Sequence, residues 1–230
     1  MKKLSLKISW LLLLIIIPLT LWISAEFLEN KKYYFISLLI IIYLMIPFFM
    51  QFEQKKPQAR EIILVAVMVS IGVAGRSAFF MLPHFKPTVA IVIITGLAFG
   101  AETGFLSGAM TAFISNFFFG QGPWTIWQMF CLGVIGFVSG LLSKTKLKYN
   151  KKLLCIYGAF VTLFLYGGII NIYSALMGSS VINLEILLIY YIQALPFDLI
   201  HAFSTTIFLF FIAEPMLEKI NRVKTKYGLL

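Results

Sequence analysis

Long apolar stretches, separated by short clusters of charged residues, glycine or proline, make up most of the chain. A transmembrane α-helix needs about 20 consecutive, mostly apolar residues, so stretches of this length predict membrane spans. We therefore predict an all-α integral membrane protein with eight transmembrane helices. The apolar stretches cover residues 8–25, 34–52, 61–82, 88–99, 103–119, 125–143, 153–176 and 186–213.

The stretch 88–99 is short for a span and is followed by a polar break, Gly100 to Thr103. One continuous helix through this break would place Glu102 at the centre of the bilayer, at a cost of about 2.5–3.5 kcal/mol. We therefore predict a helical hairpin with Glu102 at its tip. Glycines recur every fourth residue from position 96 to position 108, a spacing that fits tight packing of two short helices.

The composition supports a membrane protein. Of the 230 residues, 60% are hydrophobic and only 12% are charged, and the mean hydropathy is +0.95. The net charge of +10 would suit nucleic acid, but that function needs basic side chains on one soluble face. Here they occur in short clusters between apolar stretches, which disfavours nucleic-acid binding.

The positions of Lys and Arg predict the orientation, because basic residues accumulate on the cytoplasmic side of membrane proteins. Alternating the eight spans places nearly all of them on one side, which makes both termini cytoplasmic. Lys31, Lys32, Arg76 and Lys86 are the exceptions on or near the outer side. The prediction is a multi-pass protein of the cell membrane.

The first two spans stand apart from the rest. Residues 1–25 have a basic start, an apolar stretch and a possible cleavage point, as in a secretory signal. Because a second apolar stretch follows closely, we favour an uncleaved two-helix hairpin over cleavage. The charged segment Glu53–Arg60 then divides the chain into an N-terminal membrane extension, 1–56, and a six-helix core, 57–230.

A strip of small residues runs along one face of the helix expected at 61–82. Its members recur every fourth residue: Ala66, Ser70, Ala74 and Ala78. In lipid, close approach through small residues is a main source of affinity between helices, so the strip suits either a partner subunit or internal packing. If it faces a partner, Arg76 and Phe80 face the interior of the bundle.

Aromatic and polar side chains gather at the outer loops, where they offer stacking surfaces and amides to an organic ligand. An interfacial aromatic belt and an arginine that extends to the headgroups are the alternatives. A lone loop histidine is more often solvated than metal-bound, so we predict no metal site. The predicted ligand-binding residues are Arg76, Phe79, Phe80, His84, Asn116, Gln121, Trp124, Trp127 and Gln128.

Catalytic motifs are weak in this sequence. Asp198 and His201 share a helix face and could act as acid and base, but no nucleophile is spaced to join them, so we favour a structural pair. The stretch Ser143–Thr145 lacks the glycine that a phosphate-binding loop needs before its lysine. A solitary secondary transporter would show an inverted repeat, and we find none. We therefore predict a protein that is not an enzyme and has no cofactor.

The segment from Gly75 to Met129 reads GRSAFFMLPHFKPTVAIVIITGLAFGAETGFLSGAMTAFISNFFFGQGPWTIWQM. It resembles the substrate-specific S components of energy-coupling factor (ECF) transporters, above all those assigned to cobalamin. More loosely, the resemblance extends over 57–230, including the small-residue strip and the stretch from Pro196 to His201. The two N-terminal helices lie outside it.

The resemblance implies an S-component bundle that captures a vitamin at the outer face, with cobalamin as the favoured substrate. It further implies docking on a transmembrane T component that two cytoplasmic ATPases drive. The family's alanine-rich contact with the T component maps onto the small-residue strip, with Ser70 a departure that keeps the small size. Another vitamin, a corrinoid precursor, or an intramembrane enzyme using Asp198 and His201 are the alternatives.

Overall fold

The computed structural model describes residues 16, 19, 33–54, 59–179 and 181–228. All regular secondary structure in these ranges is helical. The first predicted span and its possible cleavage point fall almost entirely outside the described residues. In chain order the helices are α3 (Tyr33–Gln54), α4 (Ala59–Ala78), α5 (Thr88–Phe99), α6 (Ala101–Phe119), α7 (Trp124–Leu141), the 3₁₀ turns η3 (Leu142–Lys144) and η4 (Lys146–Tyr149), α8 (Lys151–Phe160), the π-helix η5 (Val161–Gly167), α9 (Gly168–Gly178) and α10 (Leu184–Tyr227).

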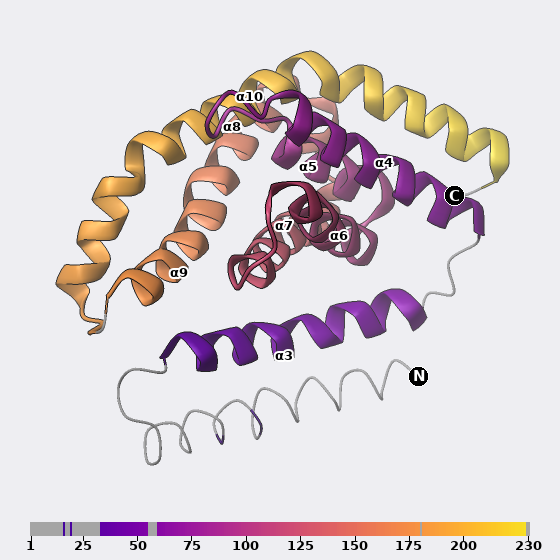
Figure 1. The fold of residues 1–230 in the computed structure, drawn as a ribbon. Coiled ribbons are helices and arrows are strands. Elements are labelled where there is room, and N and C mark those ends of the chain that lie inside the picture. The colour runs from indigo at the N-terminus through magenta and orange to yellow at the C-terminus, as the bar shows by residue number, and fades with distance from the viewer. Residues whose placement is uncertain (1–15, 17–18, 20–32, 55–58, 180, 229–230) are drawn as a thin grey trace.

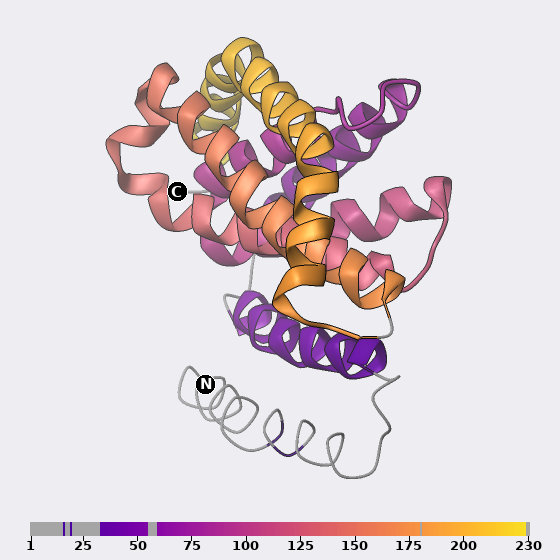
Figure 2. The same ribbon diagram turned by 90° about the vertical axis from the view of Figure 1, so that its left-hand side faces the viewer.

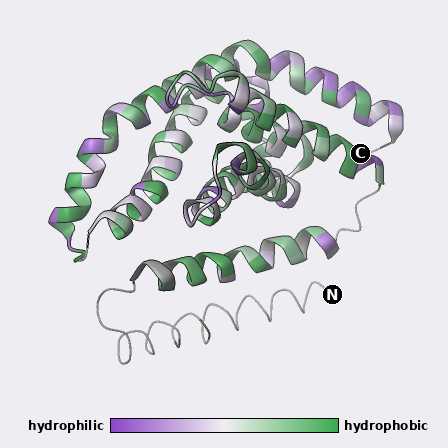
Figure 3. Cartoon of the chain, viewed as in Figure 1, coloured by the Kyte–Doolittle hydropathy of each residue, from purple (hydrophilic) through white to green (hydrophobic). Residues whose placement is uncertain are grey.

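The helices follow the predicted apolar stretches closely. Within the described part of the chain, four helical segments are long and apolar enough to cross a membrane: Ala59–Ala78, Trp124–Lys144, Lys151–Gly178 and Leu184–Tyr227. The prediction of a multi-helix membrane protein is therefore confirmed. Hydrophobic residues make up most of the helices, and hydrophilic residues gather in the last turns of α10 (Figure 3).

Helix α10 is longer than its apolar stretch, because its polar end also has partners. It continues past residue 213 to Tyr227, and Leu217 within this extension is buried. Lys224 donates a hydrogen bond of 2.8 Å to the carbonyl oxygen of Ala98 in the last turn of α5. A cation at the carboxyl end of a helix is favourable, so this contact ties α10 to the end of α5.

The predicted hairpin is present, and its first helix is the centre of the molecule. All twelve residues of α5 are buried. The chain turns at Gly100, whose φ of 92° is a conformation that favours glycine, and α6 begins at the next residue. Glu102 therefore lies at the tip of the hairpin, as expected, in the first turn of α6.

Glycines allow α5 and α6 to pack directly on the backbone of α7. A Cβ atom placed on Gly96 or Gly104 would overlap the carbonyl oxygen of Gly136, and one on Gly108 would overlap that of Leu132. Figure 1 shows α6 and α7 side by side at the centre of the bundle, with α10 arching above them.

Helix α3 covers one side of this core. It lies below α6, α7 and α9 in both views (Figures 1 and 2). Its buried Ile41 and Met45 pack in one cluster with Phe105 and Trp127, and Phe49 meets Phe105 edge-on. Helix α4 packs on α6 through Val65 and residues that follow at helical spacing.

Candidate functional site

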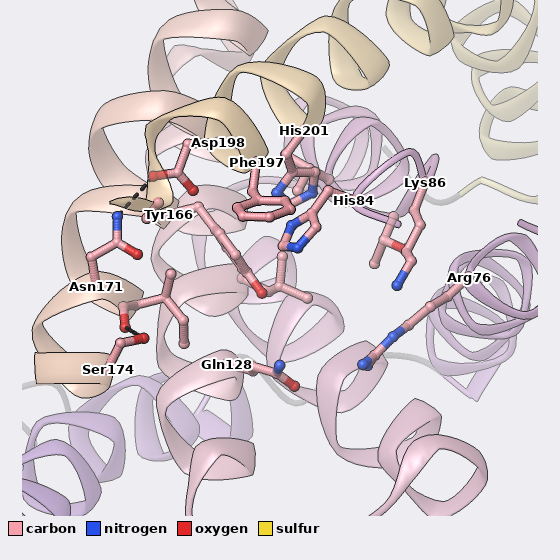
Figure 4. Close-up of a pocket in the computed structure, with 15 residues that line it drawn as sticks. Arg76, His84, Lys86, Gln128, Tyr166, Asn171, Ser174, Phe197, Asp198 and His201 are labelled. Carbon is pink, nitrogen blue, oxygen red and sulfur yellow. Dashed lines mark hydrogen bonds between the residues drawn. The ribbon is translucent and has the colours of Figure 1, made fainter. Parts of the chain in front are cut away.

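A cavity of about 320 Å³ opens among α4, α5, α7, η5, α9 and α10. Its lining includes His84 and Lys86 of the loop between α4 and α5, which the charge pattern predicts to lie on the outer side. Figure 4 shows its polar side chains on two sides. Arg76 and Lys86 lie on one side and Asp198 and Asn171 on the other, with aromatic rings between them.

The arginine side is built on a buried amide. Arg76 donates hydrogen bonds to Ser115 Oγ at 2.5 Å and to Asn116 Oδ1 at 2.8 Å. Asn116 is fully buried, and its Nδ2 donates to Thr125 Oγ1 and Gln128 Oε1 at 2.9 Å each. Asn116 therefore holds two cavity side chains, one from α4 and one from α7, in fixed positions.

The loop between α4 and α5 contributes His84 and Lys86. His84 has a φ of 60°, an uncommon conformation for a residue other than glycine, and its ring packs on Phe197 at 5.1 Å between centroids. Ser204 Oγ donates to the carbonyl oxygen of Lys86 at 3.0 Å, which fastens the loop to α10. Burial lowers the pKa of His84, and the charge of Lys86 lowers it further while Asp198 opposes the shift, so folding favours the neutral imidazole.

The acidic side depends on the π-helix. Asp198 accepts a hydrogen bond of 2.7 Å from Asn171 Nδ2. A Cβ atom on Gly167 would lie 2.8 Å from Asp198 Oδ2, so a larger residue there would have to displace this carboxylate. Tyr166, in the same π turn, meets His201 edge-on at 4.9 Å. Local π-helices often occur at functional sites, and this one brings Tyr166 to the cavity wall.

The expected pairing of Asp198 with His201 is therefore wrong. Among the described residues, the carboxylate takes its hydrogen bond from Asn171, and the imidazole packs against Tyr166 and faces His84 at 6.4 Å. A shared helix face brought both side chains to one cavity, but α9 supplied the better donor.

Three of the predicted ligand-binding residues line the cavity, namely Arg76, His84 and Gln128, and Asn116 lies directly behind them. Arg76 points into the bundle as expected. Phe80 does not: it is 60% exposed and stacks on Phe119 at 5.4 Å. The helix α4 ends at Ala78, so the periodicity that placed Phe80 inside no longer applies there.

The other predicted residues lie away from the cavity. Phe79 packs on Phe208, and Trp127 packs on Tyr173 in the hydrophobic cluster that α3 covers. Gln121 donates instead to the carbonyl oxygen of Phe113 in α6, and Trp124 donates to that of Gly120 in the α6–α7 connection. Their role as ligand contacts stays a prediction.

The sequence analysis missed the contribution of the later helices. The cavity is also lined by Tyr166, Asn171 and Phe197. Asp198, which was expected to form a structural pair with His201, lines the cavity as well. A signal was present, because amides and carboxylates inside apolar spans are functional by default. In the described part of the chain no three His, Cys, Asp or Glu side chains come together as metal ligands.

The small-residue strip of α4 lies on the surface. Its four members are all exposed: Ala66, Ser70, Ala74 and Ala78. The large apolar neighbours Ile63, Val67 and Ile71 are exposed beside it. The strip is therefore available to a partner helix or to lipid.

Comparisons with known proteins find one matching family model and several relatives. The family model described as "ECF-type riboflavin transporter, S component" matches residues 56–218. A UPF0397 protein of Vibrio atlanticus (strain LGP32) is 25% identical over 135 residues, which cover 55% of this chain and 74% of the relative. UPF0397 proteins of Aliivibrio fischeri (strain MJ11) and Aliivibrio salmonicida (strain LFI1238) are 25% and 27% identical. These two matches cover 48% and 49% of this chain, and 64% and 66% of the relatives. No solved structure matches significantly.

Proposed function

The chain belongs to the S components of ECF-type transporters, and from this premise we propose that it captures a compact vitamin in the cavity between Arg76 and Asp198. S components are multi-pass membrane proteins of transport and not enzymes. They bind a vitamin and work with a T component and ATPases. The intramembrane enzyme considered for Asp198 and His201 is thereby set aside.

The observation that carries the proposal is a polar cavity inside an apolar bundle. Ionisable and amide groups are costly within a membrane protein and are kept where they meet a ligand or one another. Here Arg76, Asp198 and Asn171 face one cavity from three different helices. Aromatic rings beside polar groups are the usual lining of a site for a small organic molecule.

The size of the cavity bears on the choice of vitamin. Its volume of about 320 Å³ is at the lower end of the range of about 300–1,000 Å³ that is typical of ligand sites. This supports a compact vitamin of the size of a flavin over cobalamin, whose corrin macrocycle and appended nucleotide are far larger. The description of the matched family model as riboflavin-type points the same way. Cobalamin, favoured by the resemblance of the outer loops, is the competing substrate.

We further propose how the subunit sits in its complex. The exposed strip of α4 suits docking on the T component, because small residues allow a partner helix to approach closely in lipid. The charge pattern supports cytoplasmic termini and a cavity on the outer side. In this proposal 57–230 form a six-helix S-component core, with α8, η5 and α9 as one span, and 1–56 add a two-helix hairpin.

The test is equilibrium binding to the purified full-length chain, with riboflavin, cobalamin and other vitamins in competition. We expect tight binding of one compact vitamin, and a Gln128→Ala variant that binds it about tenfold more weakly because Gln128 lines the cavity. Gln121→Ala is the matched control, since Gln121 bonds to Phe113 and Thr125 outside the cavity. Tight binding of cobalamin, weakened by Gln121→Ala and not by Gln128→Ala, would move the site to the outer loops.

A further inference from the structure

The amino end of α5 opens onto the cavity, since Thr88 and Val89 both line it. The first N–H groups of a helix have no carbonyl acceptor within that helix. Pro87, which precedes Thr88, provides no side-chain cap, and the first turn of α5 is buried. Free N–H groups and the positive end of the helix dipole favour a negative charge at such a position.

The hydroxyl of Thr88 gives a second and independent sign of a ligand. Thr88 is only 6% exposed, and its Oγ1 has no hydrogen-bond partner among the described residues. The buried Thr95 and Thr111 instead donate to the carbonyl oxygen four residues earlier in their helices. Thr88 stands at the first position of α5, where no helical carbonyl precedes it, so its hydroxyl is left to the cavity.

Two cations complete this end of the cavity. In the part of the chain that the structure describes, neither Arg76 nor Lys86 lies within salt-bridge distance of a carboxylate. The carboxylate of the cavity, Asp198, is bonded to Asn171 on the opposite side (Figure 4). Burial lowers the pKa of Lys86, and the charge of Arg76 lowers it further, because two cations share one site with no anion between them.

We propose that the captured vitamin carries an acidic group, a carboxylate or a phosphate, that binds at the amino end of α5 between Arg76, Lys86 and the hydroxyl of Thr88. The inference rests on the proposed function and narrows its substrate class. An anion there would accept charge-assisted hydrogen bonds from both cations and a further bond from Thr88. The opposite side, with Asp198 as acceptor, suits N–H or O–H groups on the remainder of the molecule.

Pairs of compounds that differ in one acidic group test this directly. We would titrate the purified full-length chain at low ionic strength with nicotinate and nicotinamide, pantothenate and pantothenol, and flavin mononucleotide and riboflavin. Inorganic phosphate is titrated alone, with thermal stability as the readout. We expect the acidic member of the pair that binds to do so at least tenfold more tightly than its neutral partner, and phosphate to raise the melting temperature.

The outcomes separate this inference from the proposed function. A neutral member that binds as tightly as its acidic partner overturns the anion site and leaves vitamin capture standing. Stabilisation by phosphate with binding of no vitamin supports the anion site and contradicts the capture of these vitamins. No response to phosphate or to any acidic compound overturns the anion site.

Two variants locate the acidic group. Thr88→Val removes the hydroxyl at nearly constant shape, and Lys86→Gln removes one cation while the backbone carbonyl bonded to Ser204 is retained. Each should weaken binding of the acidic compound by about tenfold. Thr95→Val and Lys152→Gln are the matched controls and should change it less than twofold, because neither residue lines the cavity. Equal effects in variants and controls would overturn the assignment.

Discussion

Two strips of small residues in this protein have the same spacing and opposite surroundings. The glycines at 96, 104 and 108 are buried against the backbone of α7, whereas the alanine-rich strip of α4 is exposed. Glycine allows two backbones to touch, as at Gly104 and Gly136, and any side chain there would overlap the neighbouring chain. Alanine already carries a Cβ atom, and its strip offers a smooth surface instead of a backbone contact.

The comparison shows that spacing alone does not separate a strip that holds the fold from one that is free to bind. Residue type gives part of the answer, since glycine costs more conformational entropy and is kept where close approach requires it. The rest is decided by which face meets the core. Substitutions in each strip test this distinction directly.

The glycine strip should tolerate no added side chain. We expect Gly104→Ala to lower the free energy of unfolding by about 3 kcal/mol, because the new Cβ would overlap backbone atoms of α7 that cannot move aside. Unfolding by a denaturing detergent measures this. Gly168→Ala is the control and should be nearly neutral, since no atom lies within 4 Å of a Cβ placed there. Equal stability of the two variants would contradict the account of the packing.

The alanine-rich strip should tolerate the opposite change. Ala74→Leu should alter the free energy of unfolding by less than about 0.5 kcal/mol, because Ala74 is exposed. Vitamin binding by the isolated chain should persist, and ATP-driven uptake in cells that express the T component and ATPases should be lost. Ser70→Ala keeps the small size and should retain uptake. Loss of vitamin binding in Ala74→Leu would instead place the strip within the binding unit.

A buried amide links the fold to the cavity. Asn116→Ala should lower the free energy of unfolding by about 2 kcal/mol, because Arg76 loses one of its acceptors inside the bundle. It should also weaken ligand binding about tenfold, since Gln128 loses its donor. Unfolding and binding are measured on the same preparation, with Asn221→Ala as the control. An unchanged affinity for the ligand would mean that Asn116 contributes to the packing of the bundle and not to binding.

The smallest effect concerns pH. Folding lowers the pKa of His84 below its ordinary value of about 6.5, so the unfolded chain binds more protons as the pH falls through that value. Stability contributed by the neutral imidazole is therefore present at pH 7.5 and decreases towards pH 5.5. Because His84 is partly exposed, we expect a change of only a few tenths of a kcal/mol. A His84→Gln variant should show a shallower pH dependence of the free energy of unfolding. The same pH dependence in the variant and the parent protein would exclude His84 as its source.

Much of the fold followed from the sequence, and less of the site did. The short apolar stretch 88–99 and the polar break after it predicted the hairpin at Glu102, and helical periodicity predicted that Arg76 points inward. Asp198 was seen as an ionisable group in a span, but its partner was misassigned, because the donor, Asn171, belongs to another helix 27 residues earlier. Phe80 was misplaced because the helix ended before it.

The sequence was sufficient to predict most of the helices and which residues share a face of each, because these depend on local periodicity and on the cost of polar groups in lipid. Which of the two strips meets α7, and which polar groups share a cavity, could be learned only from the packing of the helices. Arg76, Thr88, Gln128, Asn171 and Asp198 come from five helices. Their convergence depends on how whole helices pack, as in the contact of Ser204 with Lys86 across 118 residues, and no local pattern encodes that distance.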